Sequence, residues 1–325
     1  MRRVLALLAL LGACRAPEGP ALRPLAPPPD PGVPDSPGEV IVVCGERFAA
    51  GTPVVLWFEH PFYDAYATEP RFVAPSASTP KGLRYHPGRD VADSELRARV
   101  EREGWTVETL GRVIDLFVLH YDACGTSRTC FDVLQDRRGL SVHFLLDVDG
   151  TIYQTLDLEE QAWHARQANP RSIGIEIAHV GAFAPGEASP LDEWYATLDR
   201  ETRLSIPAQR SSGIRTPDFA GRPARDELVV GEIQGDVWAQ YDFTPEQYEA
   251  LVKLTRTLTS VFPRLSPDAP RDAQGHLRTG VLSDEELAGF HGILGHYHVS
   301  PDKRDPGPAF DWERFLAELG ASPRP

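Results

Sequence analysis

Two histidines, a lysine and an aspartate have the types and the spacing of a metal-dependent hydrolytic site. Three of them, His296, Lys303 and Asp305, lie close together around a Pro-Gly turn in GHYHVSPDKRDPGPAFDW. The fourth, His120, ends the apolar run VIDLFVLHYD far upstream. Two imidazoles and a carboxylate offer three nitrogen and oxygen ligands to Zn²⁺, and such a set leaves a fourth coordination position for water. The pattern therefore predicts a catalytic metal site and not a structural one.

The segments that must position these residues have the composition of buried strands. VIDLFVLHY, which carries His120, is nearly continuous in large apolar residues, as in a strand covered on both faces. RSIGIEIAHV is a second such run, in which alternating isoleucines pack one face and Glu176 points to the other. SVHFLLDVDGTIYQTL predicts a hairpin whose turn contains Asp149-Gly150.

Helices are predicted between these strands. Residues 93–103 and 130–138 have helical patterns, and two shorter helices begin near Ser283 and Asp311. The clearest helix begins at Thr244, which is followed by an N1 proline and an N3 glutamine, and leucines at helical spacing then line one face. Strands that alternate with helices predict an α/β fold, with a central mixed β-sheet flanked by helices on both faces.

The composition is that of a folded, acidic protein. The 325 residues, 42% of them hydrophobic, suffice for one large core or two modest ones, and one catalytic domain with extensions is the simplest organisation. The formal net charge of −14 argues against a nucleic-acid partner, because such binding needs Lys and Arg to neutralise phosphates. We expect a monomer.

The first 39 residues have the features of an export signal and a tether. Residues 1–13 combine two arginines with a short apolar run, which is typical of a signal peptide and short for a bilayer span. LGAC resembles a bacterial lipobox, which implies cleavage before Cys14 and lipidation of its thiol; an ordinary secretory signal is the alternative. Residues 14–39, rich in proline, then form an extended tether between the membrane and the folded part.

Two segments have no role that the sequence reveals. Residues 40–91 hold two β-like runs and a loop-rich stretch, and they form either an N-terminal extension packed on the catalytic domain or a separate small module. The catalytic domain is predicted over residues 92–320. Inside it, residues 181–239 form a long insertion rich in Pro, Gly, Ser and Arg, and loops of this length usually carry function or are disordered.

Four segments carry a family resemblance through their order and spacing: FVLHYD, SVHFLLDVDGTIYQTLDLEEQAWHA, SIGIEIAH and GHYHVSPDKRDPGPAFDW. Together they resemble the zinc-dependent N-acetylmuramoyl-L-alanine amidases of the amidase-2 group, which includes AmpD-type enzymes, phage T7-type lysozymes and peptidoglycan recognition proteins. The resemblance covers about residues 113–319 without the insertion. It implies the amidase-2 fold, similar to that of peptidoglycan recognition proteins.

The resemblance also implies a metal site and a catalytic carboxylate. His120, His296 and Asp305 match the ligands of one Zn²⁺ per chain. Glu176 matches the acidic residue that faces the zinc-bound water, where it can take a proton and pass it to the leaving amine. T7-type relatives have a tyrosine where this chain has Val142, so the catalytic role falls on Glu176.

Further residues are expected around this site. Lys303 matches the family lysine that stabilises the tetrahedral oxyanion, and its neighbour Arg304 is the alternative. Tyr121, which follows the first ligand, lines the groove or packs in the core. Trp163 and His164 are expected in the cleft wall, in contact with substrate.

Two histidines and two cysteines near the motifs need separate treatment. His298, two residues after His296, would face the same side on a strand, but we expect it beside the site and not as a ligand. His143 is expected to pack in the hairpin. Cys124 and Cys130 are the natural disulfide pair, as the loop CGTSRTC resembles a cysteine pair in peptidoglycan recognition proteins; two buried thiols are the alternative.

These expectations converge on an N-acetylmuramoyl-L-alanine amidase that cleaves the amide between N-acetylmuramic acid and L-alanine in peptidoglycan or muropeptides. A lipid anchor would hold it at the periplasmic face of the envelope, and Arg15 in place of Asp after the cysteine favours the outer membrane of a Gram-negative host. A non-catalytic peptidoglycan receptor is a second possibility, against which Glu176 and Asp305 argue. A zinc peptidase acting on stem peptides is a third, although no HExxH helix is present.

Overall fold

The computed structural model describes residues 38–72, 74–76, 78–208 and 213–320. The predicted signal peptide, Cys14 and nearly all of the predicted tether lie outside these ranges. Within them, no helix has both the length and the apolar character needed to cross a membrane.

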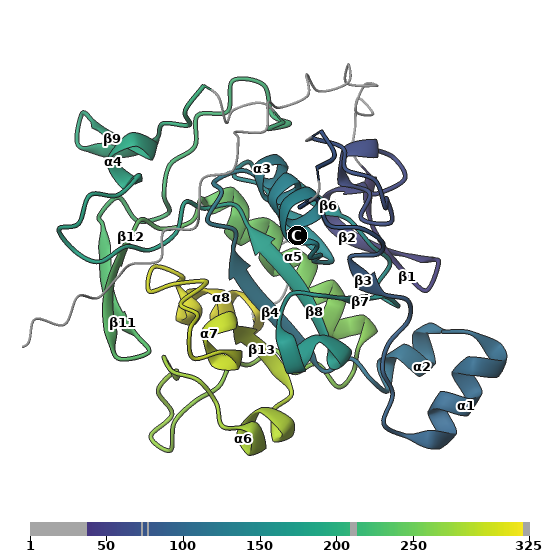
Figure 1. Cartoon of the computed structure of the whole chain (residues 1–325). Helices are drawn as coiled ribbons and strands as arrows, with labels where there is room; N and C mark the ends of the chain where they lie inside the picture. The colour runs from purple at the N-terminus through teal and green to yellow at the C-terminus, as the bar shows by residue number, and fades with distance from the viewer. Residues whose placement is uncertain (1–37, 73, 77, 209–212, 321–325) are drawn as a thin grey trace, which may run out of the picture.

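A seven-stranded mixed sheet forms the centre of the molecule, in the order β1-β2-β6-β5-β8-β4-β13 (Figure 1). The pairs β5–β8, β8–β4, β4–β13 and β2–β6 are parallel, whereas β1–β2 and the predicted hairpin β5–β6 are antiparallel. The predicted central mixed sheet is thereby confirmed. Its strands are Gly38–Val43 (β1), Glu46–Leu56 (β2), Leu116–Tyr121 (β4), Phe144–Leu146 (β5), Ile152–Gln154 (β6), Ser172–Ile177 (β8) and Gly292–Gly295 (β13).

Helices cover both faces of this sheet, as predicted. The isoleucines of β8 and Phe117 and Leu119 of β4 pack in one core with the long helix α5. Leu116 and Val118 point to the opposite face, where they pack against α6, α7 and η3. The helices are Ser94–Glu103 (α1), Val107–Gly111 (α2), Ser127–Asp132 (α3), Leu191–Trp194 (α4), Pro245–Val261 (α5), Asp284–Gly289 (α6), His296–Val299 (α7) and Trp312–Gly320 (α8), with the 3₁₀ turns Pro61–Tyr63 (η1) and Arg166–Arg171 (η3) and the π turn Val133–Arg138 (η2).

The helix α5 begins where its sequence predicts. The Thr244 hydroxyl accepts a hydrogen bond from the Gln247 amide at 3.1 Å, and the Gln247 side chain accepts one from the Thr244 amide at 2.9 Å. This reciprocal pair satisfies two backbone donors that the first turn leaves without helical partners. Leu251, Leu254 and Leu258 then bury one side of α5 against the sheet.

The register of the parallel strands brings the candidate site residues together at the carboxyl ends of β4 and β8. His120 of β4 is paired directly with Glu176 of β8, and Leu116 and Leu119 of β4 are paired with Gly292 and Gly295 of β13. Paired residues on neighbouring strands point to the same face, so His120 and Glu176 both project away from α5. The carboxyl ends of parallel strands are where open α/β sheets place ligands.

The two segments without a predicted role both contribute structure. Residues 40–91 hold most of β1 and all of β2, and β2 is paired with β6 of the central sheet. The region 181–239 holds α4 and two antiparallel hairpins that stand beside the central sheet (Figure 1). The remaining strands are Tyr85–His86 (β3), Gln161–Ala162 (β7), Tyr195–Leu198 (β9), Glu201–Leu204 (β10), Val229–Ile233 (β11) and Asp236–Gln240 (β12).

Candidate metal centre

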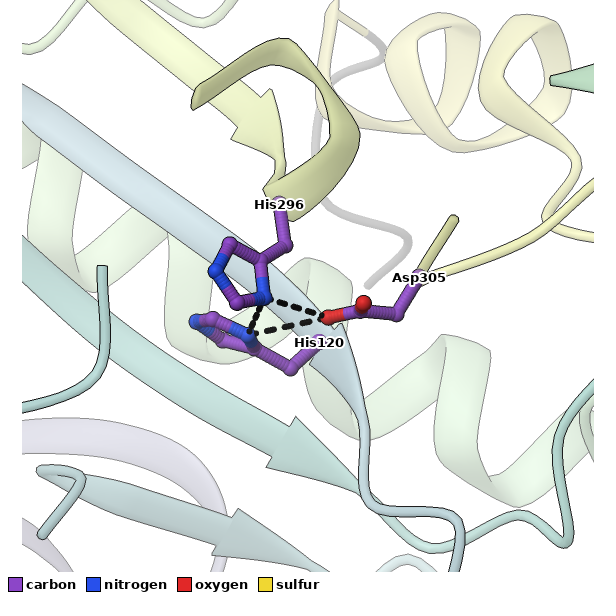
Figure 2. Close-up of side chains that lie close together, drawn as sticks. All are labelled: His120, His296 and Asp305. Atoms are coloured by element: carbon purple, nitrogen blue, oxygen red, sulfur yellow. Dashed lines mark hydrogen bonds and ion pairs between the residues drawn. The ribbon is translucent and has the colours of Figure 1, made fainter. Parts of the chain in front are cut away.

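The three residues predicted as metal ligands lie together at the carboxyl ends of β4 and β13 (Figure 2). His120 Nδ1 is 3.0 Å from His296 Nδ1 and 3.0 Å from Asp305 Oδ2, and His296 Nδ1 is 2.9 Å from the same oxygen. Ligands at about 2.0–2.1 Å from a tetrahedral Zn²⁺ are about 3.3 Å apart, which is close to this triangle. In the part of the chain that the structure describes, no other group of this kind is found.

Local structure brings the three donors together from distant positions. His120 lies near the end of β4, and His296 begins the one-turn helix α7 directly after β13. The chain then returns to the site, because the Tyr297 amide donates a hydrogen bond to the Asp305 carbonyl at 3.2 Å. Two adjacent parallel strands and one short loop therefore form the site.

Burial and mutual contact set protonation states that suit a metal. Burial, and then the neighbouring His296, lower the pKa of His120 to about 4. Burial opposes ionisation of Asp305, but His296 and His120 outweigh it and hold the pKa of that carboxyl below its ordinary range. A neutral imidazole and an ionised carboxylate are the forms that bind a divalent cation, so the donor set fits Zn²⁺.

Glu176 lies beside this cluster and is poorly solvated. Its Oε2 is buried and accepts no hydrogen bond within the described residues. Burial, followed by the negative charge of Asp305, raises the pKa of Glu176 well above its ordinary value. A carboxyl group in such an environment holds a proton more readily than an exposed one, which suits general acid–base chemistry.

A cavity of about 750 Å³ opens onto these groups. Lys303 and Arg304 both line it, but in different ways. Lys303 is half-buried, with its ammonium 3.9 Å from Asp302 Oδ2, whereas the Arg304 guanidinium stacks 3.8 Å from the centre of the Trp238 ring. Trp238 lies on β12, so the insertion contributes directly to the surroundings of the cavity.

Of the residues expected to contact substrate, Tyr121 and Trp163 line the cavity, and so does His164. His164 has a further contact that the sequence did not suggest: its Nδ1 lies 3.0 Å from His120 Nε2. Its other nitrogen lies 3.2 Å from the hydroxyl of Ser172. The ring of His164 therefore bridges the first ligand and β8.

Gly174 makes room for this bridge. A Cβ atom at position 174 would lie 2.5 Å from Nδ1 of His164, which is too close for any real contact. Ser172 and Gly174 are parts of the site that the motifs in the sequence did not indicate. The available signal was the glycine inside an otherwise β-branched strand, since such glycines often mark a close approach of another group.

His298 and His143 lie away from the ligand triangle. The ring of His298 accepts a hydrogen bond from the Gly295 amide at 2.9 Å and contacts the Arg278 carbonyl at 2.8 Å, so both nitrogens are occupied. The expectation of a strand at His296 and His298 was wrong, because helix α7 begins at His296 and the two rings diverge. His143 is fully buried and accepts a hydrogen bond from the Gly174 amide at 3.1 Å.

The predicted disulfide is absent from the structure. Cys124 and Cys130 are both free cysteines; Cys124 precedes the helix α3 and Cys130 lies within it. Burial raises the pKa of Cys130, and a side-chain hydrogen bond with the nearby Cys124 thiol raises it further. The structure thus corresponds to the alternative of two thiols.

Comparison with known proteins gives a consistent family. The family of N-acetylmuramoyl-L-alanine amidases (Amidase_2) matches residues 110–308. The 1,6-anhydro-N-acetylmuramyl-L-alanine amidase AmpD of Salmonella typhimurium is 23% identical over 185 residues, which are 56% of this chain and 59% of that protein. AmpD of Enterobacter cloacae is 31% identical over 106 residues, which are 32% of this chain and 43% of that protein. The chain thus spans less than two thirds of these relatives.

Similar solved structures include an AmpD crystal structure and a complex of AmiD from E. coli with anhydro-N-acetylmuramic acid-L-Ala-D-gamma-Glu-L-Lys. The AmpD structure is 20% identical, with a TM-score of 0.31, and the match covers 64% of this chain and 86% of that one. The AmiD complex is 20% identical, with a TM-score of 0.33, and the match covers 65% and 60% of the two chains.

Proposed function

Because the chain belongs to the N-acetylmuramoyl-L-alanine amidase family, we propose that it hydrolyses the amide between N-acetylmuramic acid and L-alanine in peptidoglycan or muropeptides. The observation that carries this proposal is the triangle of His120, His296 and Asp305, with the half-buried Glu176 in the same cavity. A receptor that only bound peptidoglycan would have no use for an unsatisfied carboxyl at that place.

One Zn²⁺ per chain is the proposed cofactor, held by His120, His296 and Asp305. When bound, it would polarise the scissile carbonyl and lower the pKa of a water molecule in the site. The three donors match its preference for nitrogen and oxygen ligands, and the cavity leaves room for water and substrate on one side.

Glu176 is the proposed general base and acid. It would accept a proton from the attacking water as the new C–O bond forms, and return that proton to the alanine nitrogen as the C–N bond breaks. Its raised pKa favours this exchange, since a less acidic carboxyl is a stronger base toward the attacking water.

Lys303 is the proposed oxyanion stabiliser. Among the described residues, its ammonium has a single ion-pair partner, the exposed Asp302 3.9 Å away, so it is available to a negative charge that develops in the cavity. Removing one such donor costs about 3–4 kcal/mol of transition-state stabilisation in enzymes of known energetics. Arg304, the alternative candidate, is then not needed to stabilise the oxyanion.

The proposed substrate carries a stem peptide of the kind named for the AmiD complex, in which D-γ-Glu follows L-Ala. We extend the proposal to the cell envelope: cleavage of residues 1–13, lipidation of Cys14 and a proline-rich tether over residues 14–39 would hold the enzyme at the periplasmic face of the outer membrane.

Product analysis on defined muropeptides tests this proposal. The purified chain, loaded with zinc, is expected to release N-acetylmuramic acid and a peptide with a free L-alanine amine, as identified by mass spectrometry. Treatment with a chelator should stop the reaction, and added Zn²⁺ should restore it. Cleavage inside the stem peptide would identify a peptidase, and binding without cleavage a receptor; either result would refute the amidase.

A further inference from the structure

Arg304 has surroundings that suit a recognition group. Its guanidinium stacks on Trp238 at 3.8 Å and interacts with the hydroxyl of Tyr121. Among the described residues it forms no ion pair, whereas another cation of the same cavity, Arg166, pairs with Asp302 at 3.1 Å. Arg304 is therefore a half-buried cation, held in place by an aromatic face, whose charge is left for a ligand.

The hairpin β11–β12 holds this arrangement against the catalytic loop. At its turn, the Gln234 side chain donates hydrogen bonds to the carbonyls of Tyr297 at 2.7 Å and Ser300 at 3.1 Å. Further along, the Gln240 side chain donates to the Pro306 carbonyl and accepts from the Ala309 amide, both at 3.1 Å. Gln234 of the insertion thus holds the segment that carries His296, Arg304 and Asp305, and Gln240, directly after the insertion, holds the residues that follow this segment.

The hairpin also fixes the aromatic platform. Trp238 is half-buried, and its Nε1 donates a hydrogen bond to the carbonyl of Ile233 at 3.4 Å, across the same hairpin. The indole is therefore not free to swing away from the guanidinium. An arginine stacked in this way keeps the donors at its edge available, because the ring occupies only its flat face.

We propose that Arg304, seated on Trp238, binds the free α-carboxylate of the second residue of the stem peptide. This inference rests on the proposed function. In a D-γ-Glu residue the chain continues through the side-chain carboxyl, so the α-carboxylate stays ionised, one residue from the scissile amide. Arg304 directly precedes Asp305 and Tyr121 directly follows His120, so the two residues that would receive this carboxylate adjoin two metal ligands in the chain.

Two matched muropeptides test the inference: one with the α-carboxylate of the second residue and one with its carboxamide. The wild-type chain should bind and cleave the carboxylate form about 10- to 100-fold better, as expected for a charge-assisted hydrogen bond. Arg304→Gln should remove this preference. Trp238→Ala should weaken it, and Trp238→Phe should restore most of it, with zinc content unchanged throughout. Arg166→Gln, at the paired cation, is the control and should keep the preference.

Affinity measured by calorimetry on the Glu176→Gln chain, which leaves the muropeptides intact, separates this inference from the proposed function. Equal affinity for the two muropeptides, or a preference that survives Arg304→Gln, would overturn the inference even if the amide is cleaved. A preference that depends on Arg304 would support it even if the wild-type chain proved to be a receptor that cleaves neither compound.

Discussion

Replacing His164 with alanine should weaken zinc binding without unfolding the protein. With Nδ1 of His120 directed at the metal, the proton of this ring must lie on Nε2, where His164 accepts it at 3.0 Å. In the metal-free chain, His120 can instead place its proton on Nδ1 and donate it to Asp305 at 3.0 Å. Loss of His164 therefore penalises the metal-bound form selectively.

The magnitude follows from the burial of that donor. His120 is only 2% exposed, so an Nε2–H group without an acceptor costs about 1–3 kcal/mol. This corresponds to a zinc affinity about 5- to 150-fold weaker, in line with the tenfold to hundredfold effects of outer-shell partners. Ser172→Ala should cost less, because it removes only the partner of the far nitrogen. Gly174→Ala should cost as much as His164→Ala, because the new Cβ displaces the ring.

Competition with a chromophoric chelator measures the zinc affinity, and urea unfolding of the metal-free chain measures stability. His179→Asn is the matched control: this histidine is buried and bonded to the Tyr241 carbonyl at 2.9 Å, away from the triangle. It should lower the free energy of unfolding and leave the zinc affinity unchanged. If His164→Ala bound zinc within twofold of the wild type, the bridge would have no part in orienting His120.

Three further outcomes are expected. Glu176→Gln should lower kcat about 10²–10⁴-fold while one zinc per chain stays bound, and Glu193→Gln, an exposed residue of α4, should not; an active Glu176→Gln enzyme would contradict the proton-transfer role. Lys303→Gln should lower kcat about 10²–10³-fold with little change in KM, and a rise in KM alone would indicate a ground-state contact instead. Burial lowers the pKa of His179 from 6.5 to about 4, so, as the pH falls, the unfolded chain takes up a proton on this ring before the folded chain does. The contribution of the neutral His179 to the free energy of unfolding is therefore lost as the pH falls from about 6.5 to about 4. The stability advantage of the metal-free wild type over His179→Gln in urea should thus shrink by about 2–3 kcal/mol between pH 7.5 and pH 4.5, and a difference independent of pH would refute the buried neutral imidazole.

The central sheet follows from local sequence because its strands depend on short-range patterns, and these strands position His120 and His296. Apolar runs predict β4 and β8, and the alternating isoleucines predict the side on which Glu176 lies. His296 and Asp305 are only nine positions apart around a turn, so their closeness can also be predicted from the sequence. The prediction that His296 and His298 lie on one strand was wrong for a local reason. The pattern of GILGHYHV predicts a strand to its end, but the strand β13 ends at Gly295 and the helix α7 begins at His296, where the chain turns back toward Asp305.

The rest depends on contacts between segments that no local pattern joins. That β1 and β2 belong to the catalytic sheet follows from the pairing of Val54 with Ile152, about a hundred residues away. Gln234 and Gln240 look like ordinary polar residues of a hairpin. Only the folded structure shows that their side chains donate hydrogen bonds to the carbonyls of Tyr297 and Pro306, in and directly after the loop that carries His296 and Asp305.

This dependence gives the insertion a physical role in the site. The loop from His296 to Asp305 supplies two ligands and two cations, yet it has only one helical turn of regular structure. Its ordering costs about 1–2 kcal/mol of backbone entropy per residue, and the Gln234 hydrogen bonds to Tyr297 and Ser300 offset part of that cost. The Gln240 hydrogen bonds to Pro306 and Ala309 hold the chain directly after the loop. The hairpin β11–β12 therefore contributes to the candidate site by holding this loop, although it contains none of the three candidate metal-binding residues.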